Sequence, residues 1–437
     1  MKACVKVYSA PAVGAVTETI TGIVDRDGAP FTTLACIILG YTGLNAINRY
    51  AKWLDGFDGI APSTHWGNTF DEDNDFALKD ICGAFGDRPF LDLKAQITFG
   101  GVIEGGGYIS AARSGEIDIT FDGNTRPGAM IIICLGGDDL QQKLIFQTNP
   151  AAATCGFEPV AVINKYQGGT GSVTTGGSGG QFGFGWATKS DGHFGAAAGL
   201  VESGAGNERF QRTDKALSFI DTSSSHSDKT VSVWGSNGLT FSGDSFASAH
   251  LALGGIQAVS GTWSQGDTSV VTGLDNKLVI VMSFGHASDS SILTDQAEIC
   301  IGVFDGSQQA SYWTGEITIG DSATLKGARY MSDATGLRFA TPNGSSTAFN
   351  SIFTFSGFNR VSQSFTGTWA SDDSSGRQLL YIALGDIPQP PNDLSGIYKV
   401  VKDKTNDTVY SSQDPITTED VAIPNPFAMT HFIGDEQ

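Results

Sequence analysis

The chain has 437 residues, of which 40% are hydrophobic and 16% are charged, and its formal net charge at pH 7 is −20. A disordered chain would combine low hydrophobicity with high charge, so extensive disorder is excluded. Nucleic-acid binding and attachment to an anionic membrane both require positive charge, so neither is expected. The length corresponds to two to four domains of roughly 100–200 residues each.

Two further features bear on where the protein folds. The longest apolar run, 129–135, is far shorter than the roughly 20 residues of a membrane-spanning helix, and the first residues lack the apolar stretch of a signal peptide. The six cysteines form no CxxC pair and are too sparse for a disulfide scaffold. We therefore expect no membrane insertion, a reducing compartment, and burial of Cys36 and Cys134 in strands.

Three segments of the chain carry the same short motifs in the same order, which indicates an internal repeat. Each segment opens on an apolar run rich in β-branched residues, which predicts a strand. These openings lie at 31–38, 157–163 and 274–281, aligned at Leu34, Val160 and Leu278. In the first segment the opening is followed, at 44–53, by the one helix that the sequence predicts.

A second shared motif, in the middle of each segment, places a glycine, then an arginine, then an aromatic residue. It occurs at 86–90, 206–210 and 327–330. Because all three copies carry it, we interpret it as a requirement of the fold rather than as a repeated ligand site.

Each segment closes with two more predicted strands. The first of them starts at or near a glycine and then alternates in polarity, the pattern of a half-buried strand. Its copies lie at 114–121, 236–241 and 356–361. The second is an apolar run ending in Leu-Gly, and its three glycines are Gly136, Gly254 and Gly385.

Short strands separated by turn-forming residues predict an all-β protein. We expect three tandem antiparallel β-sandwich (jelly-roll-like) repeats and an extended C-terminal arm. The predicted boundaries are 1–140, 141–258 and 259–386 for the repeats and 387–437 for the Pro-rich linker and docking arm. The Gly-rich segment 168–180 is predicted to be a long surface loop. The arm is too short for a core of its own, so we expect it to dock on a neighbouring subunit.

The motifs in the sequence do not predict catalysis. Residues 176–180 match the GxSxG pattern, but a nucleophile elbow needs a strand before the serine and a helix after it. The histidines are isolated, so no zinc site is predicted. His250 lies beside Leu251 in an apolar run, which favours a core or interface position. We therefore expect no enzyme, no catalytic residue and no cofactor.

The acidic segment at 71–75 is a weak candidate for a metal site. Asp71, Asp73 and Asp75 alternate as the ligands of a calcium loop do, but Phe76 and Cys82 stand where an EF-hand requires glycine and glutamate. A solvated acidic loop is the preferred interpretation, and a bound divalent ion is the alternative.

Aromatic residues that interrupt the repeat pattern are the candidates for ligand binding. Loops and exposed side chains carry binding more often than the residues that build the fold. We expect such a role, on exposed surface, for Trp66, Tyr312 and Trp313.

The second segment carries the repeat most clearly, with Gly-Phe-Glu-Pro-Val-Ala at 156–161, Arg-Phe-Gln-Arg-Thr-Asp-Lys at 209–215 and Leu-Ala-Leu-Gly-Gly at 251–255. This pattern resembles a family of tandem β-sandwich repeat proteins encoded in structural gene clusters of tailed bacteriophages and in marine viral sequences. The resemblance covers roughly residues 1–386, and the first and third segments depart from it in the opening and the middle.

The resemblance implies a structural protein of a virion, assembled in the host cytoplasm. We expect a tail-associated or fibre-like component that forms a symmetric oligomer, contacts other virion proteins and contributes to attachment to a host surface glycan or receptor. The first alternative is a head decoration protein that clamps capsomers. The second is a glycan-binding module or a glycan-degrading enzyme, and the enzyme would require two acids in a cleft.

Overall fold

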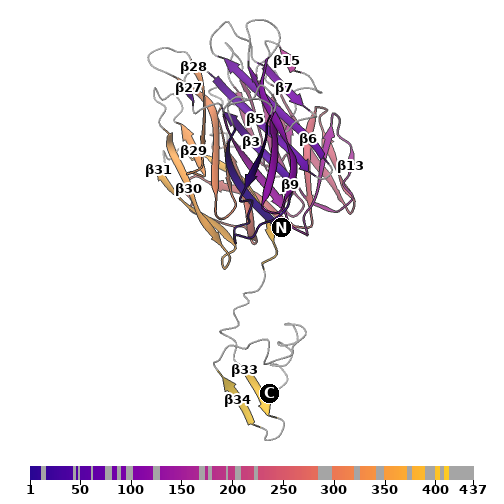
Figure 1. The fold of residues 1–437 in the computed structure, drawn as a ribbon, viewed down its shortest axis with the longest axis vertical. Coiled ribbons are helices and arrows are strands. Elements are labelled where there is room, and N and C mark those ends of the chain that lie inside the picture. The colour runs from indigo at the N-terminus through magenta and orange to yellow at the C-terminus, as the bar shows by residue number, and fades with distance from the viewer. Residues whose placement is uncertain are drawn as a thin grey trace. The chain divides into compact units, whose positions relative to one another are not determined.

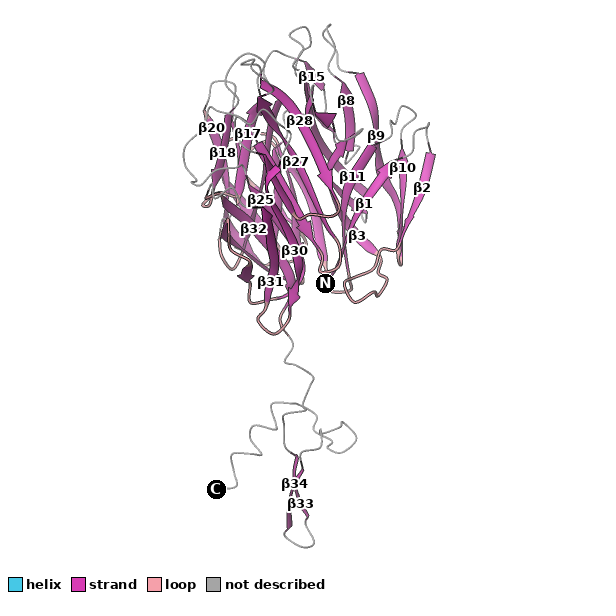
Figure 2. Ribbon diagram, turned by 90° about the vertical axis from the view of Figure 1, so that its left-hand side faces the viewer, coloured by secondary structure: helices cyan, strands magenta, loops and turns pink. Residues whose placement is uncertain are grey.

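In the computed structural model, the described residues are 1–10, 16–42, 46–47, 50–60, 63–73, 81–85, 90–94, 102–121, 128–166, 173–175, 180–192, 195–201, 208–220, 225–283, 298–318, 325–340, 349–371, 376–388, 399–403 and 408–412. Their regular elements are antiparallel strands, as predicted (Figure 2). None of these residues forms a helix that could cross a membrane. The chain divides into two compact units, Met1–Ile387 and Pro388–Gln437.

The first sheet pair comes from the start of the chain. Its larger sheet has the order β1-β11-β3-β5-β6-β7, and its smaller sheet has the order β2-β10-β9-β8. The strands are β1 (Lys2–Ala10), β2 (Val16–Thr21), β3 (Thr33–Thr42), β5 (Tyr50–Ile60), β6 (Ser63–Asp73), β7 (Ile81–Phe85), β8 (Phe90–Lys94), β9 (Val102–Arg113), β10 (Glu116–Phe121) and β11 (Gly128–Gly136).

The second sheet pair follows directly. Its larger sheet has the order β12-β22-β14-β16-β17-β18, and its smaller sheet has the order β13-β21-β20-β19. The strands are β12 (Gln141–Gln147), β13 (Ala152–Thr154), β14 (Pro159–Tyr166), β16 (Gly180–Thr188), β17 (Ala196–Val201), β18 (Glu208–Arg212), β19 (Leu217–Ile220), β20 (His226–Gly235), β21 (Gly238–Gly243) and β22 (Ser248–Gly254).

The third sheet pair has the same pattern, β23-β32-β25-β26-β27-β28 and β24-β31-β30-β29. Its strands are β23 (Gln257–Ser264), β24 (Ser269–Val271), β25 (Asp275–Ser283), β26 (Glu298–Phe304), β27 (Gln309–Thr318), β28 (Leu325–Ser332), β29 (Leu337–Ala340), β30 (Phe349–Asn359), β31 (Ser364–Ser371) and β32 (Gln378–Asp386). The same strand order thus occurs three times along the chain.

Alternation along the strands gives each larger sheet two apolar faces. On β3, Cys36 and Ile38 face the smaller sheet of their own pair, where they contact Ile117 and Ile119 of β10. Ile37 lies between them in the sequence and points the opposite way, because successive side chains of a strand alternate. This double burial explains why the closing strands are continuous apolar runs: every residue of β22 is buried.

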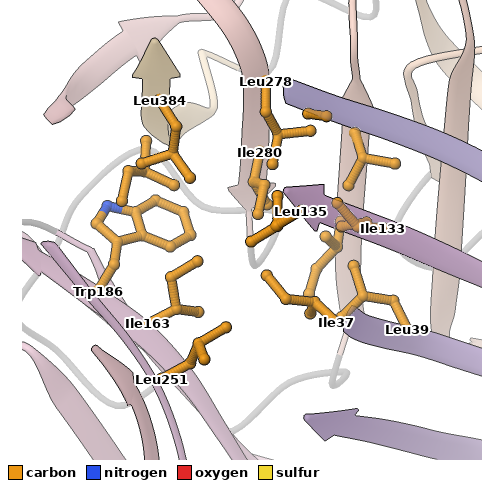
Figure 3. Packing of buried hydrophobic residues seen from close by; sticks show 14 of the residues in the cluster. Ile37, Leu39, Ile133, Leu135, Ile163, Trp186, Leu251, Leu278, Ile280 and Leu384 are labelled. Atoms are coloured by element: carbon orange, nitrogen blue, oxygen red, sulfur yellow. The ribbon is translucent and has the colours of Figure 1, made fainter. Parts of the chain in front are cut away.

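The outward faces of the three larger sheets meet in one common core. Figure 3 shows side chains of this cluster from all three sheet pairs: Ile37, Leu39, Ile133, Leu135, Ile163, Trp186, Leu251, Leu278, Ile280 and Leu384. Strands from opposite ends of the sequence therefore lie side by side, as the indigo and orange strands of Figure 1 do. Burial of each large apolar side chain contributes about 1.5–3 kcal/mol, so this core joins the sheet pairs tightly.

The repeated Leu-Gly ending has a steric cause. The end of each closing strand pairs antiparallel with the start of the opening strand, and the residues there lie so close to the closing glycine that a side chain would not fit. A Cβ atom at Gly136 would lie 2.3 Å from the carbonyl oxygen of Thr32, and one at Gly385 would lie 2.4 Å from that of Asp275. At Gly254 it would lie 2.5 Å from the ring of Phe157. Glycine is therefore required at the same place in each sheet pair.

Two short strands cross from one sheet pair to another. β15 (Val173–Thr175) pairs with β7 of the first pair, and β4 (Ala46–Ile47) pairs with β28 of the third. The helix predicted at 44–53 is wrong, because β4 and the first residues of β5 occupy the described part of it and pair as strands. The predicted surface loop at 168–180 likewise contains β15.

The motif alignment is wrong in two places. Leu278 pairs with Leu384, whereas the residues that pair with the corresponding Leu135 and Leu253 are Ala35 and Ala161, one position after those aligned in the sequence. The segment 356–361 lies in β30 and its following turn, so β31 holds the ninth place that β10 and β21 hold in the other pairs. A one-residue slip reverses the face of every side chain, which is why motif spacing alone misplaces them.

The middle motif is also only partly equivalent. Its arginine and aromatic residue lie in the sixth strand of the second and third pairs, β18 and β28, but in the first pair Phe90 begins β8, the seventh strand. The second compact unit contains the paired strands β33 (Lys399–Asp403) and β34 (Thr408–Ser412), so its described residues are not simply an extended arm.

Candidate functional site

The structure does not expose the aromatic pair predicted to bind a ligand. Tyr312 is 1% exposed and Trp313 is 3% exposed, so the expectation of exposure is wrong. Both lie on β27, an inner strand between β26 and β28, where one ring enters the common core and the other enters the third sandwich. Trp313 packs edge-to-face on Phe349 with ring centroids 5.5 Å apart. Trp66 lies in β6 opposite Phe57, and its side chain is outside the described residues.

The acidic metal candidates fall at the end of β6. Asp71 and Asp73 belong to that strand, although their side chains are not described, and Asp75 lies outside the described residues. Among the residues that the structure does describe, no group of three or more metal-ligating side chains occurs. The acidic segment therefore stays an untested prediction.

Turn carboxylates join one sheet pair to the first strand of the next. Asp305, after β26, accepts a hydrogen bond from the backbone N–H of Val5 at 2.7 Å. Asp191, after β16, accepts one from the N–H of Ser260 at 3.0 Å. Val5 and Ser260 hold the same register on the edge strands β1 and β23. Each carboxylate thus satisfies an edge N–H that its own sheet leaves open.

These contacts close a ring. The third pair contacts the first through Asp305, and the second contacts the third through Asp191. The first and second pairs meet where the Lys165 Nζ lies 5.2 Å from the ring centroid of Phe57, and where β15 adds to β7. A head-to-tail contact that returns to its start after three steps has the organisation of a closed trimer.

Ion pairs reinforce the contact between the first and third sheet pairs. The Arg26 guanidinium, 7% exposed, donates to the Asp275 carboxylate and to the Asn276 carbonyl, and Arg360 binds Asp27 at 2.6 Å. Burial alone would raise the pKa of Asp275, but hydrogen bonds from Arg26 and Lys277 hold it below its usual value. Asp275 is therefore ionised in the folded protein.

A polar chain of Lys229, Ser248, His250 and Asn164 is buried in the second sandwich. All four residues are 0% exposed. The Lys229 ammonium donates to the Ser248 hydroxyl at 2.6 Å, and that hydroxyl contacts His250 Nε2 at 2.8 Å. His250 Nδ1 contacts Asn164 Oδ1 at 2.7 Å, and the Asn164 amide donates to the carbonyl of Ala216 at 2.9 Å.

The side-chain amide of Asn164 determines which atom donates and which accepts in each hydrogen bond of the polar chain. Because the Asn164 NH₂ group faces a carbonyl, its oxygen must accept from His250, so Nδ1 carries the imidazole proton. Nε2 is then an acceptor, and Ser248 donates to it. Burial, with a smaller effect of the Lys229 charge, holds the pKa of His250 well below its usual value. The imidazole is therefore neutral.

Two carbonyl or hydroxyl dipoles and an aromatic ring stabilise the Lys229 ammonium, which is the first member of the polar chain. Lys229 also donates to the Phe246 carbonyl at 2.6 Å, and its Nζ lies 4.4 Å from the centroid of the Phe246 ring. Burial lowers the pKa of Lys229 to about 8. The lysine therefore carries a costly charge at neutral pH.

The polar chain has no counterpart in the paired positions of the other larger sheets. His250 stands four residues before the closing Gly254, and Asn164 lies opposite it on β14. At the same distance from the closing glycine, the first pair has Ile38 opposite Ile132 and the third has Val281 opposite Tyr381. The sequence predicts a core or interface position for His250, and its complete burial confirms the first of these. Its partners Asn164 and, through Ser248, Lys229 were missed because they lie on other strands.

Comparison of the chain with protein-family models, with curated proteins and with solved structures finds no match.

Proposed function

We propose that this chain is a structural protein of a tailed-phage virion, a tail- or fibre-associated component that contributes to attachment to the host surface. The proposal rests on the closed ring of three sheet pairs around one common core, together with the motif resemblance of residues 1–386. We propose no catalytic role.

We further propose that the sheet pairs are tandem copies of one jelly-roll-like sandwich and that residues 387–437 dock on a neighbouring subunit. The common strand order supports the first part, as do the matching contacts of Asp191 and Asp305. One chain then supplies what three identical subunits would otherwise build, which suits a position on a threefold or sixfold axis of a particle. The proposed partners are other virion proteins and further copies of this chain.

The outer faces of the smaller sheets favour a host surface glycan as the receptor. Each of these faces carries hydroxyl pairs: Thr17 with Thr120 at 2.9 Å, Thr230 with Ser242 at 2.8 Å, and Ser356 with Thr366 at 2.9 Å. Such faces offer hydrogen-bond donors and acceptors to a sugar. The same surface would serve a free glycan-binding module, which is the alternative from another class. Head decoration is the alternative within the virion.

Quantitative mass spectrometry of purified virions, calibrated on the portal and major capsid proteins, tests the proposal. We expect a few to a few dozen copies per particle. Hundreds of copies would show head decoration instead. Absence from the particle would overturn both virion functions and leave the glycan-binding module, for which binding to a glycan array is the next measurement.

A further inference from the structure

We propose that the polar chain makes the second sheet pair an acid-sensitive element of the ring, which opens on acidification before the first and third pairs do. The acid-sensitive group is the neutral imidazole of His250, which is completely buried. It contacts the Ser248 hydroxyl, and the buried Lys229 ammonium donates to that same hydroxyl. The inference is independent of the proposed virion function.

Hydrogen bonding alone does not prevent protonation of His250. Nε2 is the nitrogen left to receive a proton, and Ser248 could then accept from it by turning its own proton toward the Gln147 carbonyl, 3.3 Å away. The charge is what cannot be accommodated, because a second cation would share the Ser248 hydroxyl with Lys229. The folded protein therefore excludes the proton, whereas an opened second pair accepts it.

The surrounding elements offer the imidazole no compensating carboxylate in the described part of the chain. β20 contributes Lys229, and the carboxylate of its neighbour Asp228 is bonded to Ser218 and Arg212 instead. From β21, Phe241 stacks on the imidazole at 4.0 Å.

The remaining neighbours are apolar or cationic. On β12, Ile145 lies opposite His250, and Lys143, two residues earlier on the same face, is near Cys155; on β19, Leu217 lies opposite Lys229. On β14, Lys165 follows Asn164 and points the opposite way, toward Phe57 of the first pair.

Opening of the second pair would be felt by the whole ring. His250 faces the second sandwich, but Leu251 (Figure 3) and Leu253, on the opposite face of β22, belong to the common core. Loosening β22 therefore withdraws side chains against which the first and third pairs pack. The consequence is a ring of sheet pairs whose stability depends on pH through one buried group.

The expected pH dependence follows from linkage. An unfolded histidine has a pKa of about 6.5, and a folded state that excludes the proton loses stability as pH falls below that value. The equilibrium constant for opening the second pair should rise about 30-fold between pH 7.5 and 5.0, and its slope should approach about tenfold per pH unit only well below pH 6.5. The first and third pairs have no histidine among their described core residues, so this increase should be largest in the second.

Hydrogen–deuterium exchange of the full chain, read by mass spectrometry at pH 7.5 and 5.0 and corrected for intrinsic exchange, tests this. Peptides from 226–254 should gain exchange at acidic pH, while those from 102–121 and 349–371 serve as internal controls. Equal changes in all three regions, or none, would overturn the proposal without any variant.

Two variants give a second, independent test. Asn164→Ile with His250→Ile copies the pair Ile38 and Ile132 and should abolish the acid response of 226–254. His226→Gln removes an accessible histidine of the same sheet pair and should leave the response intact. If the double variant folds and keeps the acid response, the polar chain is not its cause.

Discussion

Truncation of one side chain in the common core should destabilise all three sheet pairs together. Leu251 is 0% exposed and belongs to the cluster that contains Ile37 of the first pair and Ile280 of the third. Leu251→Ala removes three buried carbon atoms and leaves a cavity that the neighbouring side chains of the other sheets cannot fill. A leucine-to-alanine change in such a core costs about 2–5 kcal/mol.

That cost translates into a measurable melting shift. The compact unit Met1–Ile387 has 387 residues, and an unfolding entropy of about 2.1 cal/mol/K per residue gives about 0.8 kcal/mol per kelvin for the unit. Leu251→Ala should therefore lower the Tm by about 3–6 °C. Scanning calorimetry should show a single transition that moves as a whole.

The matched control is Leu239→Ala. Leu239 is also buried, but it faces the second sandwich rather than the common core. Hydrogen exchange should then rise in β3 and β25 for Leu251→Ala and mainly in β20–β22 for Leu239→Ala. A separate transition for the second sheet pair, with exchange elsewhere unchanged in Leu251→Ala, would refute the interdependence of the sheet pairs.

Three further outcomes are expected. Gly254→Ala should cost about 1–3 kcal/mol, because its Cβ would meet both the Phe157 ring and the Glu158 carbonyl, whereas Gly357→Ala, with nothing within 4 Å, should stay within about 0.5 kcal/mol in urea unfolding. The free energy of unfolding should rise between pH 8 and about 10.5. In that range the unfolded chain holds the Lys229 proton, whereas the folded protein, in which the pKa of Lys229 is about 8, releases it. Urea titrations at several pH values should show that Lys229→Met removes this rise. Burial raises the pKa of Cys4 to about 12 and that of Cys155 to about 11. Both thiols should therefore resist iodoacetamide at pH 8 until the protein is unfolded, as peptide mapping would show. Rapid alkylation of the native protein would contradict their burial.

The features that sequence could predict are those with a local cause. The Leu-Gly endings recur because residues at the start of the paired opening strand leave no room for a Cβ there, so a residue type alone marks the closing strand. Burial of Cys36 and Cys134 follows from their apolar neighbours and is confirmed, with the two sulfurs 3.9 Å apart. Period-2 alternation likewise marked β10, whose burial alternates at every residue.

The features that sequence missed depend on partners far along the chain. Tyr312 and Trp313 looked accessible because they interrupt the repeat, yet an inner strand with two buried faces needs large side chains on both. The ring could not be inferred from motifs, because a strand that is apolar on both faces predicts burial without saying what covers it. The polar chain was visible only as His250, since Lys229 and Asn164 join it from other strands.

The short strands β4 and β15, which pair with strands of another sheet pair, constrain when the protein can fold during its synthesis. β7 receives its last described neighbour from residues 173–175, and β28 receives one from residues 46–47. A ribosome that has delivered only the first sheet pair has therefore made neither the strand that borders β7 nor the sheets that cover Ile37 and Ile133. Such a nascent chain displays apolar surface until the last closing strand, β32, has emerged, and productive folding is delayed to the end of translation. Prematurely terminated products should accordingly be insoluble rather than partly functional.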